Sequence, residues 1–323
     1  MKSLSELRQQ IAPTLRRVEK FRLEKLELAK QGWKYQIVPV LIALLGGYFL
    51  LQGEDGLVFG IITMVVAVGT FICIYIFAIN KHLNQFEEHF KEEVFTQLVH
   101  EFYPSIKFSP KRHIDSNDFN SSQLFGSHNR YSGEDFFDGT IEHTPVRFSE
   151  LAVKKVTTNG SGNNRKTTTT TIFDGLFFVV QMQKRTYGKV AVLPDSAESM
   201  FGSVGKFFQK TFGKLFQGGQ LVHFEEHPEF EKEFVVYSKE EEEAHRILTP
   251  TMLNAIYDLR YKWGSNVRLS FIDHNVYIAI SSSKNLFEVD SKQSILENSL
   301  LQELYDELIL CFSIIEDLNL QDQ

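Results

Sequence analysis

Leu57–Ile79, LVFGIITMVVAVGTFICIYIFAI, is the stretch that decides how this chain is built, because it contains no charged side chain. Helices of roughly 20 apolar residues cross the ~30 Å hydrocarbon core of a bilayer. A second apolar run, Tyr35–Leu51 (YQIVPVLIALLGGYFLL), lies just before it, and the only charged residues from 35 to 80 are Glu54 and Asp55. A charge at the centre of a membrane helix costs about 2.5–3.5 kcal/mol. The sequence therefore predicts a transmembrane hairpin at 35–80, with spans at about 35–52 and 57–79.

The flanks of the two runs predict which side of the membrane they face. Only Gln52–Gly56 (QGEDG) separates the runs, so the outer ends of the hairpin must lie on the same side. Residues 1–34 hold nine Lys or Arg and four Glu, whereas the turn is acidic. Because Lys and Arg concentrate in cytoplasmic flanks, we predict that both termini are cytoplasmic. The alternative structures are two core helices of a soluble protein and a cleaved signal peptide, which would place its apolar run nearer the start.

The residues inside the two apolar runs bear on function and on helix packing. No charge within the runs marks a proton or ion path, which argues against a pump or transporter that acts by itself. Small residues allow helices in a membrane to approach closely. The glycines at 46, 47, 60 and 69 permit such contact, but we identify no clean GxxxG face.

Amphipathic helices are predicted on both sides of the hairpin. Apolar residues recur at heptad-like spacing over residues 3–31, although Pro13 is expected to kink or divide the helix. A second apolar stripe runs from Leu83 to Phe102 and ends before Pro104. We therefore divide this region into a cytoplasmic amphipathic helix at 1–34 and a stalk helix at 81–104. The two helices can pair as an antiparallel stalk, pack on the rest of the chain, or self-associate.

The remaining residues, 105–323, predict a cytoplasmic α+β domain with an antiparallel sheet and flanking helices. Runs rich in β-branched residues indicate strands at 139–144, 146–157, 168–182 and 188–193, with a polar hairpin loop at 157–166. Two later strands, Asn266–Ile272 and Asn275–Ser281, are joined at Asp273-His274. Helices are expected after a capping box at Ser238 and Glu241, from Thr249-Pro250 to Gly264, and over about Ser291–Leu320.

Charge and cysteine content exclude some classes of function. The net charge is −7 overall, +5 in residues 1–34 and −2 in residues 35–80, which leaves −10 for residues 81–323. An acidic domain of this kind disfavours nucleic acid as a partner. Cys73 and Cys311 are the only cysteines and neither lies in a CxxC pair. A disulfide framework is thereby excluded, and zinc binding by thiolates is disfavoured.

Two polar clusters contain residue types that can bind a metal, but the surrounding sequence does not favour a metal site at either one. His223–His227 matches H-x-x-E-H, which needs a helix to place both histidines on one face. Here Pro228 follows at once, and the context indicates a strand or loop. His113, Asp115 and Asp118 lie in a polar loop typical of solvated turn residues. Signatures of phosphate loops and of the nucleophile elbow are missing from the sequence, so we predict no catalytic, cofactor-binding or metal-binding residues.

The segment Met200–Phe216, MFGSVGKFFQKTFGKLF, combines aromatic residues with a row of lysines four apart. Such a helix can lie in the membrane interface, with its aromatic side chains in the acyl region and its lysines near anionic headgroups. The alternatives are a helix packed on the sheet and a mobile lid, since three glycines weaken helicity. The predicted membrane or partner contacts are Phe201, Lys206, Phe208, Lys210, Phe212, Lys214 and Phe216.

Three runs resemble a family of uncharacterised bacterial membrane proteins that carry a domain of unknown function. They are GLFFVVQMQKRTYGKVAVLPD (175–195), HPEFEKEFVVYSKEEEEAHRILTP (227–250) and NVYIAISSSKNLFE (275–288). The motif EFxVYS…A…ILTP carries the resemblance, and the paired apolar runs are similar too. It implies a protein of the bacterial cytoplasmic membrane and brings no functional residue with it.

Together these features predict a membrane-anchored, non-enzymatic binding or scaffold module of the bacterial cell envelope. Its partners would be membrane lipid and a protein, either another membrane protein or a second copy of the chain. A membrane-tethered hydrolase with an unrecognised site is one alternative, and an accessory subunit of a membrane complex is another.

Overall fold

The computed structural model describes residues 3–160, 165–195, 219–264 and 266–318. They form an α+β structure in which two long helical arms precede a seven-stranded antiparallel sheet with its own helices. The chain divides into two compact units. The first contains residues 1–98 and 288–303, and the second contains residues 99–287 and 304–323.

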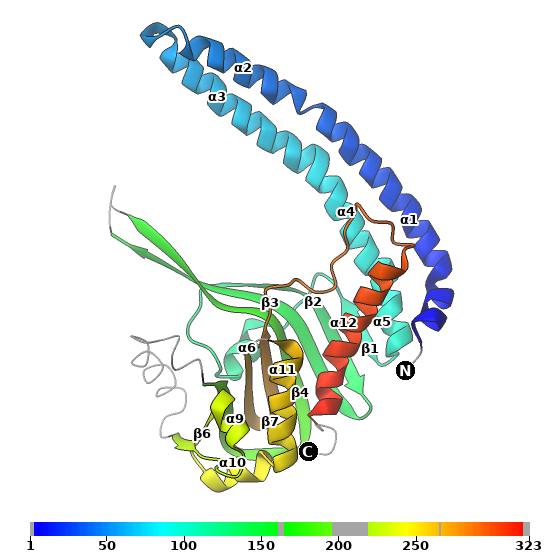
Figure 1. Cartoon of the computed structure of the whole chain (residues 1–323), viewed down its shortest axis with the longest axis vertical. Helices are drawn as coiled ribbons and strands as arrows, with labels where there is room; N and C mark the ends of the chain where they lie inside the picture. The colour runs from blue at the N-terminus through cyan, green and yellow to red at the C-terminus, as the bar shows by residue number, and fades with distance from the viewer. Residues whose placement is uncertain (1–2, 161–164, 196–218, 265, 319–323) are drawn as a thin grey trace. The chain divides into compact units, whose positions relative to one another are not determined.

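Two antiparallel arms make up most of the first unit (Figure 1). The first arm consists of α1 (Leu4–Lys34) and α2 (Ile37–Leu50). After a turn at Gly53 (φ +79°), the second arm runs through α3 (Glu54–Ile74), the π-helix η1 (Tyr75–Asn80), α4 (Lys81–Phe90), the π-helix η2 (Lys91–Phe95) and α5 (Thr96–Phe102). Since α2 lies beside α3 and α1 lies beside η1 and α4, the arms pair within the chain.

The helix α1 is held by its cap and by one apolar stripe. Ser3 and Glu6 form a reciprocal capping box at its start. Leu7, Ile11 and Leu15 lie on one face of the helix and are almost fully buried. Pro13 does not divide the helix, since α1 is continuous through this residue. The loss of one backbone hydrogen bond at the proline is offset by packing of the stripe on both sides of it.

Glycines bring α2 and α3 into backbone contact. A Cβ atom at Gly56 would collide with the carbonyl oxygen of Phe49, and one at Gly46 would lie 3.3 Å from the carbonyl oxygen of Gly60. Gly56 and Gly60 are four residues apart, so both face α2 and form a GxxxG pair. The prediction that no such face exists is therefore wrong. Gly56 was assigned to the turn, whereas α3 already begins at Glu54.

A loop at 288–297 packs on α1 through a buried ion pair. Arg22 donates two hydrogen bonds to the Glu19 carboxylate (2.9 and 2.8 Å) and one to the carbonyl oxygen of Ser291 (2.8 Å). Glu19 also accepts from the Ser294 hydroxyl (2.9 Å) and the Ile295 amide (3.2 Å). Burial favours the neutral carboxyl, but these hydrogen bonds outweigh it and lower the pKa of Glu19. The predicted helix start at Ser291 is wrong, because α12 spans Asn298–Asp317.

The sheet belongs to the second unit, and all its neighbouring strands run antiparallel. The strand order is β1-β2-β3-β4-β6-β5, and β7 also pairs with β4. The strands are β1 (Ile106–Ser109), β2 (Arg130–Ile141), β3 (Thr144–Asn159), β4 (Lys166–Pro194), β5 (Gln220–Val222), β6 (Phe234–Ser238) and β7 (Val267–Ser281). The strand expected at 139–144 coincides only with the end of β2, because the chain turns at Glu142 (φ +54°).

Both β4 and β7 fold back on themselves. The Ser281 amide donates to the Asn266 carbonyl (3.0 Å), so the two ends of β7 are neighbours, and Asp273 at its middle has φ +53°. Residues 175–181 of β4 pair with 275–281, and residues 189–192 pair with 269–272. The β7 hairpin therefore lies between the two halves of β4. The strands expected at 168–182 and 188–193 are the two halves of β4, and those expected at 266–272 and 275–281 are the two halves of β7.

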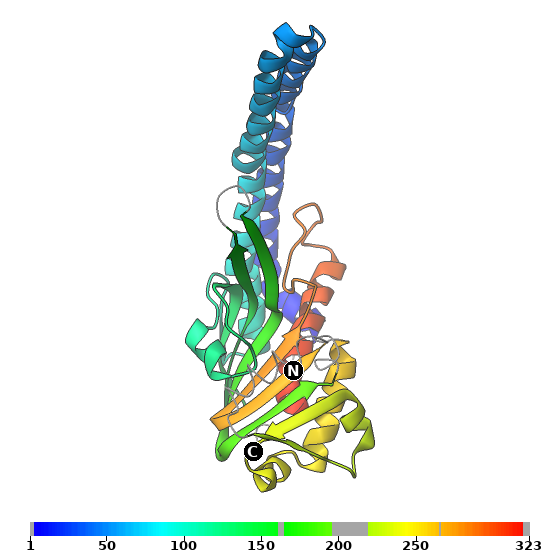
Figure 2. The same cartoon turned by 90° about the vertical axis from the view of Figure 1, so that its left-hand side faces the viewer.

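Alternate residues of the central strands enter two different cores. On one face, Phe177 joins a cluster that includes Phe119 of α6 (Ser116–Ser121). On the other face, the ring of Phe148 lies 4.7 Å from that of Phe178 and 5.7 Å from that of Phe312 in α12. Figure 2 shows α6 (teal) and α12 (red) on opposite sides of the sheet. The run Gly175–Val180 is apolar throughout because both its faces are covered.

Three shorter helices follow in the second unit: α9 (Pro228–Glu233), α10 (Glu241–Ile247) and α11 (Pro250–Trp263). As expected, Thr249 caps α11 by accepting from the Met252 amide (3.3 Å), and Gly264 ends it in the left-handed region. The expected capping box at Ser238 is wrong. The Ser238 hydroxyl instead bonds to the amide and carbonyl of Glu240 in a local turn.

We expect Gly56→Ala to destabilise the helical hairpin, because the new methyl group would overlap a backbone carbonyl that cannot rotate away. Overpacking of this kind costs about 1–3 kcal/mol. Gly69→Ala in the same helix is the matched control, since nothing lies within 4 Å of a Cβ atom there. Thermal unfolding of the detergent-solubilised chain should show a lower midpoint for Gly56→Ala and an unchanged or higher midpoint for Gly69→Ala. Equal midpoints for the two variants would rule out the close contact between α2 and α3 at Gly56.

Glu19→Gln should release the 288–297 loop, because Arg22 would lose its buried counter-ion. Breaking a buried pair on one side costs about 3–5 kcal/mol. Trypsin cleavage at the exposed Lys292 should become faster than in wild type, whereas Glu24→Gln, an exposed change on the same helix, should have no effect.

The same pair makes stability depend on pH. The folded pKa of Glu19 lies below the ordinary value of 4.5, so its contribution is complete above about pH 4.5 and is lost as the pH falls through the folded value. The difference in unfolding midpoint between wild type and Glu19→Gln should therefore narrow below about pH 4.5. A constant difference would show that Glu19 is not paired.

Candidate functional site

An exposed apolar surface covers α2, α3 and η1. Leu44 is 67% exposed, Val65 66% and Phe77 70%. Both arms contain windows long and apolar enough to cross a membrane, and only 17% and 11% of these windows are buried. Core helices of water-soluble proteins are mostly buried instead. A contiguous exposed apolar surface of this extent marks contact with lipid or with another protein.

Aromatic and basic side chains lie where this surface begins. Trp33 and Tyr35 are 53% and 62% exposed between α1 and α2, and Tyr75 is 42% exposed at the start of η1. Lys34 and Lys81 are close to them in the sequence and are exposed as well. This order of side chains is typical of a helix that enters the headgroup region of a bilayer.

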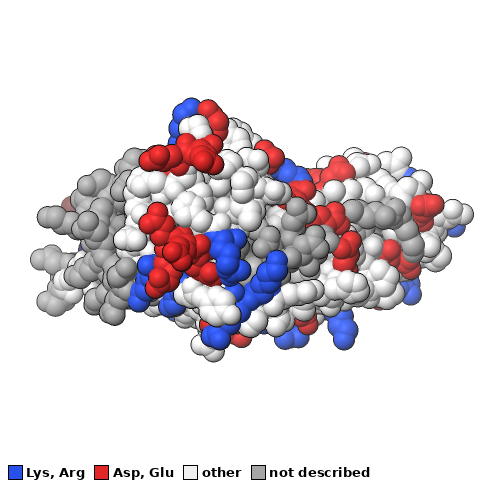
Figure 3. Space-filling view, turned by 90° about the horizontal axis from the view of Figure 1, so that it is seen from below, with Lys and Arg blue, Asp and Glu red and all other residues white. Residues whose placement is uncertain are grey.

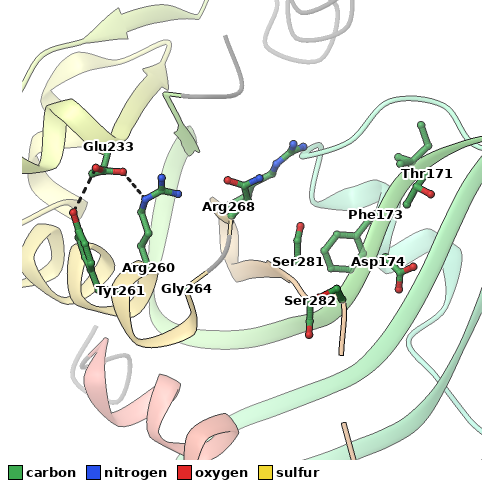
Figure 4. A pocket seen from close by; sticks show the side chains of 13 residues that line it. Thr171, Phe173, Asp174, Glu233, Arg260, Tyr261, Gly264, Arg268, Ser281 and Ser282 are labelled. Atoms are coloured by element: carbon green, nitrogen blue, oxygen red, sulfur yellow. Dashed lines mark hydrogen bonds and ion pairs between the residues drawn. The ribbon is translucent and has the colours of Figure 1, made fainter. Parts of the chain in front are cut away.

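The second unit contains a hollow of about 850 Å³ at the open end of the β7 hairpin (Figure 4). Residues 171–174 of β4 line one side, and both ends of β7 contribute, with Arg268 from the first and Ser281 from the second. Asp174 is fixed there, because its carbonyl accepts from the Ser282 amide (3.0 Å). The hollow therefore lies against β4 and the two ends of β7, and its lining carries hydroxyl, guanidinium and carboxylate groups.

Glu233 and α11 form the opposite wall of the hollow. The Arg260 side chain donates to the Glu233 carboxylate (2.6 Å), and the Tyr261 hydroxyl donates to the same carboxylate (3.5 Å). A hydrogen bond with Tyr257, partial burial and the negative charge of Glu233 raise the pKa of Tyr261 to about 12. Tyr261 is therefore neutral at physiological pH and acts as a hydrogen-bonding group. This arrangement suits the binding of a polar ligand.

The surface seen in Figure 3 carries clusters of acidic side chains next to basic ones. An uninterrupted basic field, which nucleic-acid binding would use, is not visible on this face. The predicted contact residues Phe201, Lys206, Phe208, Lys210, Phe212, Lys214 and Phe216 lie outside the residues that the structure describes. Membrane contact by that segment remains a proposal.

The H-x-x-E-H segment does not lie on a helix. His223 follows β5, and its Nδ1 is 3.3 Å from a carboxylate oxygen of Glu231, which also accepts from the Phe224 amide (2.7 Å). His227 precedes α9, and both histidines line a shallow hollow with His245. Within the described part of the chain, these histidines belong to no group of three ligand atoms lying within 4.8 Å of one another. Their geometry favours surface roles over zinc hydrolysis.

The polar loop with His113 has structural partners. Asp115 caps α6 by accepting from the amides of Asn117 (2.8 Å) and Asp118 (3.0 Å). Asp118 forms an ion pair with Arg147 (2.7 Å), and His113 Nδ1 is 2.7 Å from the Ile114 carbonyl oxygen. These contacts agree with the interpretation of the loop as turn residues.

Sequence reasoning did not find the hollow, because its residues come from distant segments. Asp174, Arg260 and Arg268 are brought together only when β7 inserts between the halves of β4. One local signal was present. Arg268 follows Val267 and precedes Leu269 in a strand whose neighbouring residues are nearly all buried.

Comparisons with known proteins give a distant structural likeness and a domain assignment. A solved structure, the crystal structure of the mycobacterial trehalose monomycolate transport factor A (TtfA), is 10% identical, with 65% of this chain and 88% of that chain covered. Its TM-score is 0.33, and we draw no conclusion on function from it. A search of curated proteins finds no match.

The model of one protein family, described as "Protein of unknown function (DUF3137)", matches residues 171–320. The matched region contains β4 from residue 171 onward, β5 to β7, α9 to α11, and α12, so it includes the hollow and the nested pairing of β4 with β7. It also contains the three runs on which the resemblance to an uncharacterised family was based. Residues 171–320 of this chain are thus a DUF3137 domain, a domain of unknown function.

Proposed function

We propose that this protein is a membrane-anchored binding module of the bacterial cell envelope. In this proposal α2, α3 and η1 lie in the cytoplasmic membrane and anchor the second unit. The exposed apolar surface of these helices carries the proposal. The transfer of one Leu or Phe side chain out of water is worth about 1.5–3 kcal/mol. A paired hairpin covered with such side chains is therefore unfavourable in water and favourable in lipid.

The lengths of the helices fit a bilayer. At 1.5 Å per residue, the apolar run 35–51 is about 26 Å long and the run 57–79 about 34 Å long. The hydrocarbon core is about 30 Å thick. Glycine contacts between α2 and α3 support the same environment, since close backbone packing is a main source of helix association in lipid.

The proposed orientation rests on charge. Residues 1–34 carry nine basic side chains against four acidic ones, whereas Glu54 and Asp55 lie in the turn. The positive-inside rule then places both termini in the cytoplasm and the turn outside. The second unit would bind its partner on the cytoplasmic side, as a non-enzymatic module.

The segment Met200–Phe216 is the proposed lipid contact of this module. Its lysines and phenylalanines match the chemistry of an anionic membrane surface. A partner protein or a second copy of the chain is the alternative occupant. A hydrolase built on His223 and His227 is less well supported, because their ligand atoms do not converge with a third in the described residues.

Fractionation of cells that express the full chain tests the anchor. The protein should remain in membranes after washing at alkaline pH and should be released by detergent. Recovery in the soluble fraction would refute the proposal.

Orientation is tested in a variant whose native cysteines are replaced. A cysteine at Asp55 should react with an impermeant maleimide in intact cells, and one at Lys292 only after the membrane is opened. The reverse pattern would refute the orientation but leave the anchor in place.

Lipid contact by residues 200–216 is tested in nanodiscs that hold the full chain. Tryptic cleavage at Lys206, Lys210 and Lys214 should be slower in discs with anionic lipid than in neutral discs, because the bound lysines are shielded. Cleavage at Lys292 serves as the internal control. Equal rates in both kinds of disc would contradict lipid contact.

A further inference from the structure

Arg268 is a mostly buried cation with few interactions. It extends from the first half of β7, and its guanidinium carbon lies 4.9 Å from the ring centroid of Phe125. Its Nη1 donates a long hydrogen bond to the Leu124 carbonyl (3.4 Å). Its Nε is shielded from solvent and has no hydrogen-bond partner. Burial lowers the pKa of Arg268 to about 10, so the side chain still carries its charge at physiological pH.

Other poorly exposed ionic groups of the chain have partners. Arg22 is paired with Glu19 (2.8 Å), and Glu243 is paired with Arg246 (2.7 Å). Arg260, on the opposite wall of the same hollow, is paired with Glu233 (2.6 Å). In contrast, no carboxylate in the described ranges lies within 4.0 Å of the Arg268 guanidinium nitrogens. A buried charge without a counter-ion costs free energy, and that cost is removed when an anion binds.

The position of Arg268 suggests where such an anion would bind. Figure 4 shows Arg268 and Ser281, from the two ends of β7, on the same hollow, with Phe173 and Thr171 across from them. Nη1 is directed to Leu124 and Nε is shielded from solvent, so Nη2 is the guanidinium nitrogen left to a ligand in the hollow. It can donate a charge-assisted hydrogen bond to a carboxylate or phosphate oxygen. The Ser281 hydroxyl, which lines the same hollow, is available to the rest of the ligand.

We propose that this hollow is a binding site for a small organic oxyanion, with Arg268 as its charged anchor. A carboxylate or phosphate group would pair with the guanidinium. The source is either a soluble metabolite or the headgroup of an anionic lipid, since both present the same oxygen atoms. The inference is independent of the membrane anchor, because it uses only residues of the second unit.

Thermal unfolding of the full chain in neutral nanodiscs tests the site. Inorganic phosphate or succinate should raise the unfolding midpoint of wild type, and sodium chloride of equal ionic strength should not. At tenfold excess over the dissociation constant, the folded-to-unfolded ratio rises about 11-fold. Discs that contain phosphatidylglycerol, without added anion, test the lipid source. A shift in either arm supports the site, and no shift in both overturns it.

Two variants separate binding from structure. Arg268→Met should abolish the anion response while leaving the ligand-free protein as stable as wild type or more stable, because it removes an unpaired buried charge. Arg246→Met, outside the hollow, should lower stability by leaving Glu243 without its arginine partner, but should keep the anion response. The proposal is overturned if Arg268→Met responds like wild type, or if it lowers the ligand-free folded-to-unfolded ratio more than tenfold.

Discussion

The insertion of the β7 hairpin between the two halves of β4 is the constraint on which the second unit depends. It makes residues 175–181 and 189–192 of β4 pair with opposite halves of one hairpin. Strand alternation then sends Phe177 to the α6 side and Phe178 to the α12 side, which gives the sheet two cores. The same insertion brings the two ends of β7 together, and the hollow lies at that open end. The insertion of the β7 hairpin therefore produces both the two-core sheet and the candidate site.

The first unit depends instead on the packing between its two helical arms and on the medium that surrounds their apolar outer side. Its arms pair through glycines and a buried stripe, while the outer side of α2 and α3 remains apolar and exposed. Aqueous solvent would oppose that arrangement and lipid would favour it. Helices in lipid must associate through close contact, because the surrounding lipid tails are as apolar as the helix surfaces. Under the proposed membrane anchor, the close contact at Gly56 and the exposed Val65 both suit a lipid environment.

Local patterns predicted the parts of the structure that are decided locally. The Thr249-Pro250 start, the Gly264 stop and the strand halves around Asp273 follow from residue types over a few positions. The failures occurred where distant segments compete with local preference. Ile295 fits a helical stripe, but it is buried in a loop because Glu19 accepts a hydrogen bond from its amide. Gly56 resembles a turn residue in the sequence, and its contact with α2 appears only in the fold. Arg268 resembles any strand arginine in the sequence, and only the fold shows that no carboxylate of the described residues pairs with it.

The pairing of α1 with the 288–297 loop has a consequence for biosynthesis. Arg22 and the carbonyl of Ser291 are 269 residues apart in the chain. At bacterial and eukaryotic elongation rates of about 5–20 residues per second, roughly 13–54 s pass between their synthesis. During that time the arginine and glutamate of α1 stay solvated, without the segment that later covers them. The nascent chain therefore completes its first helical arm last, although that arm is translated first.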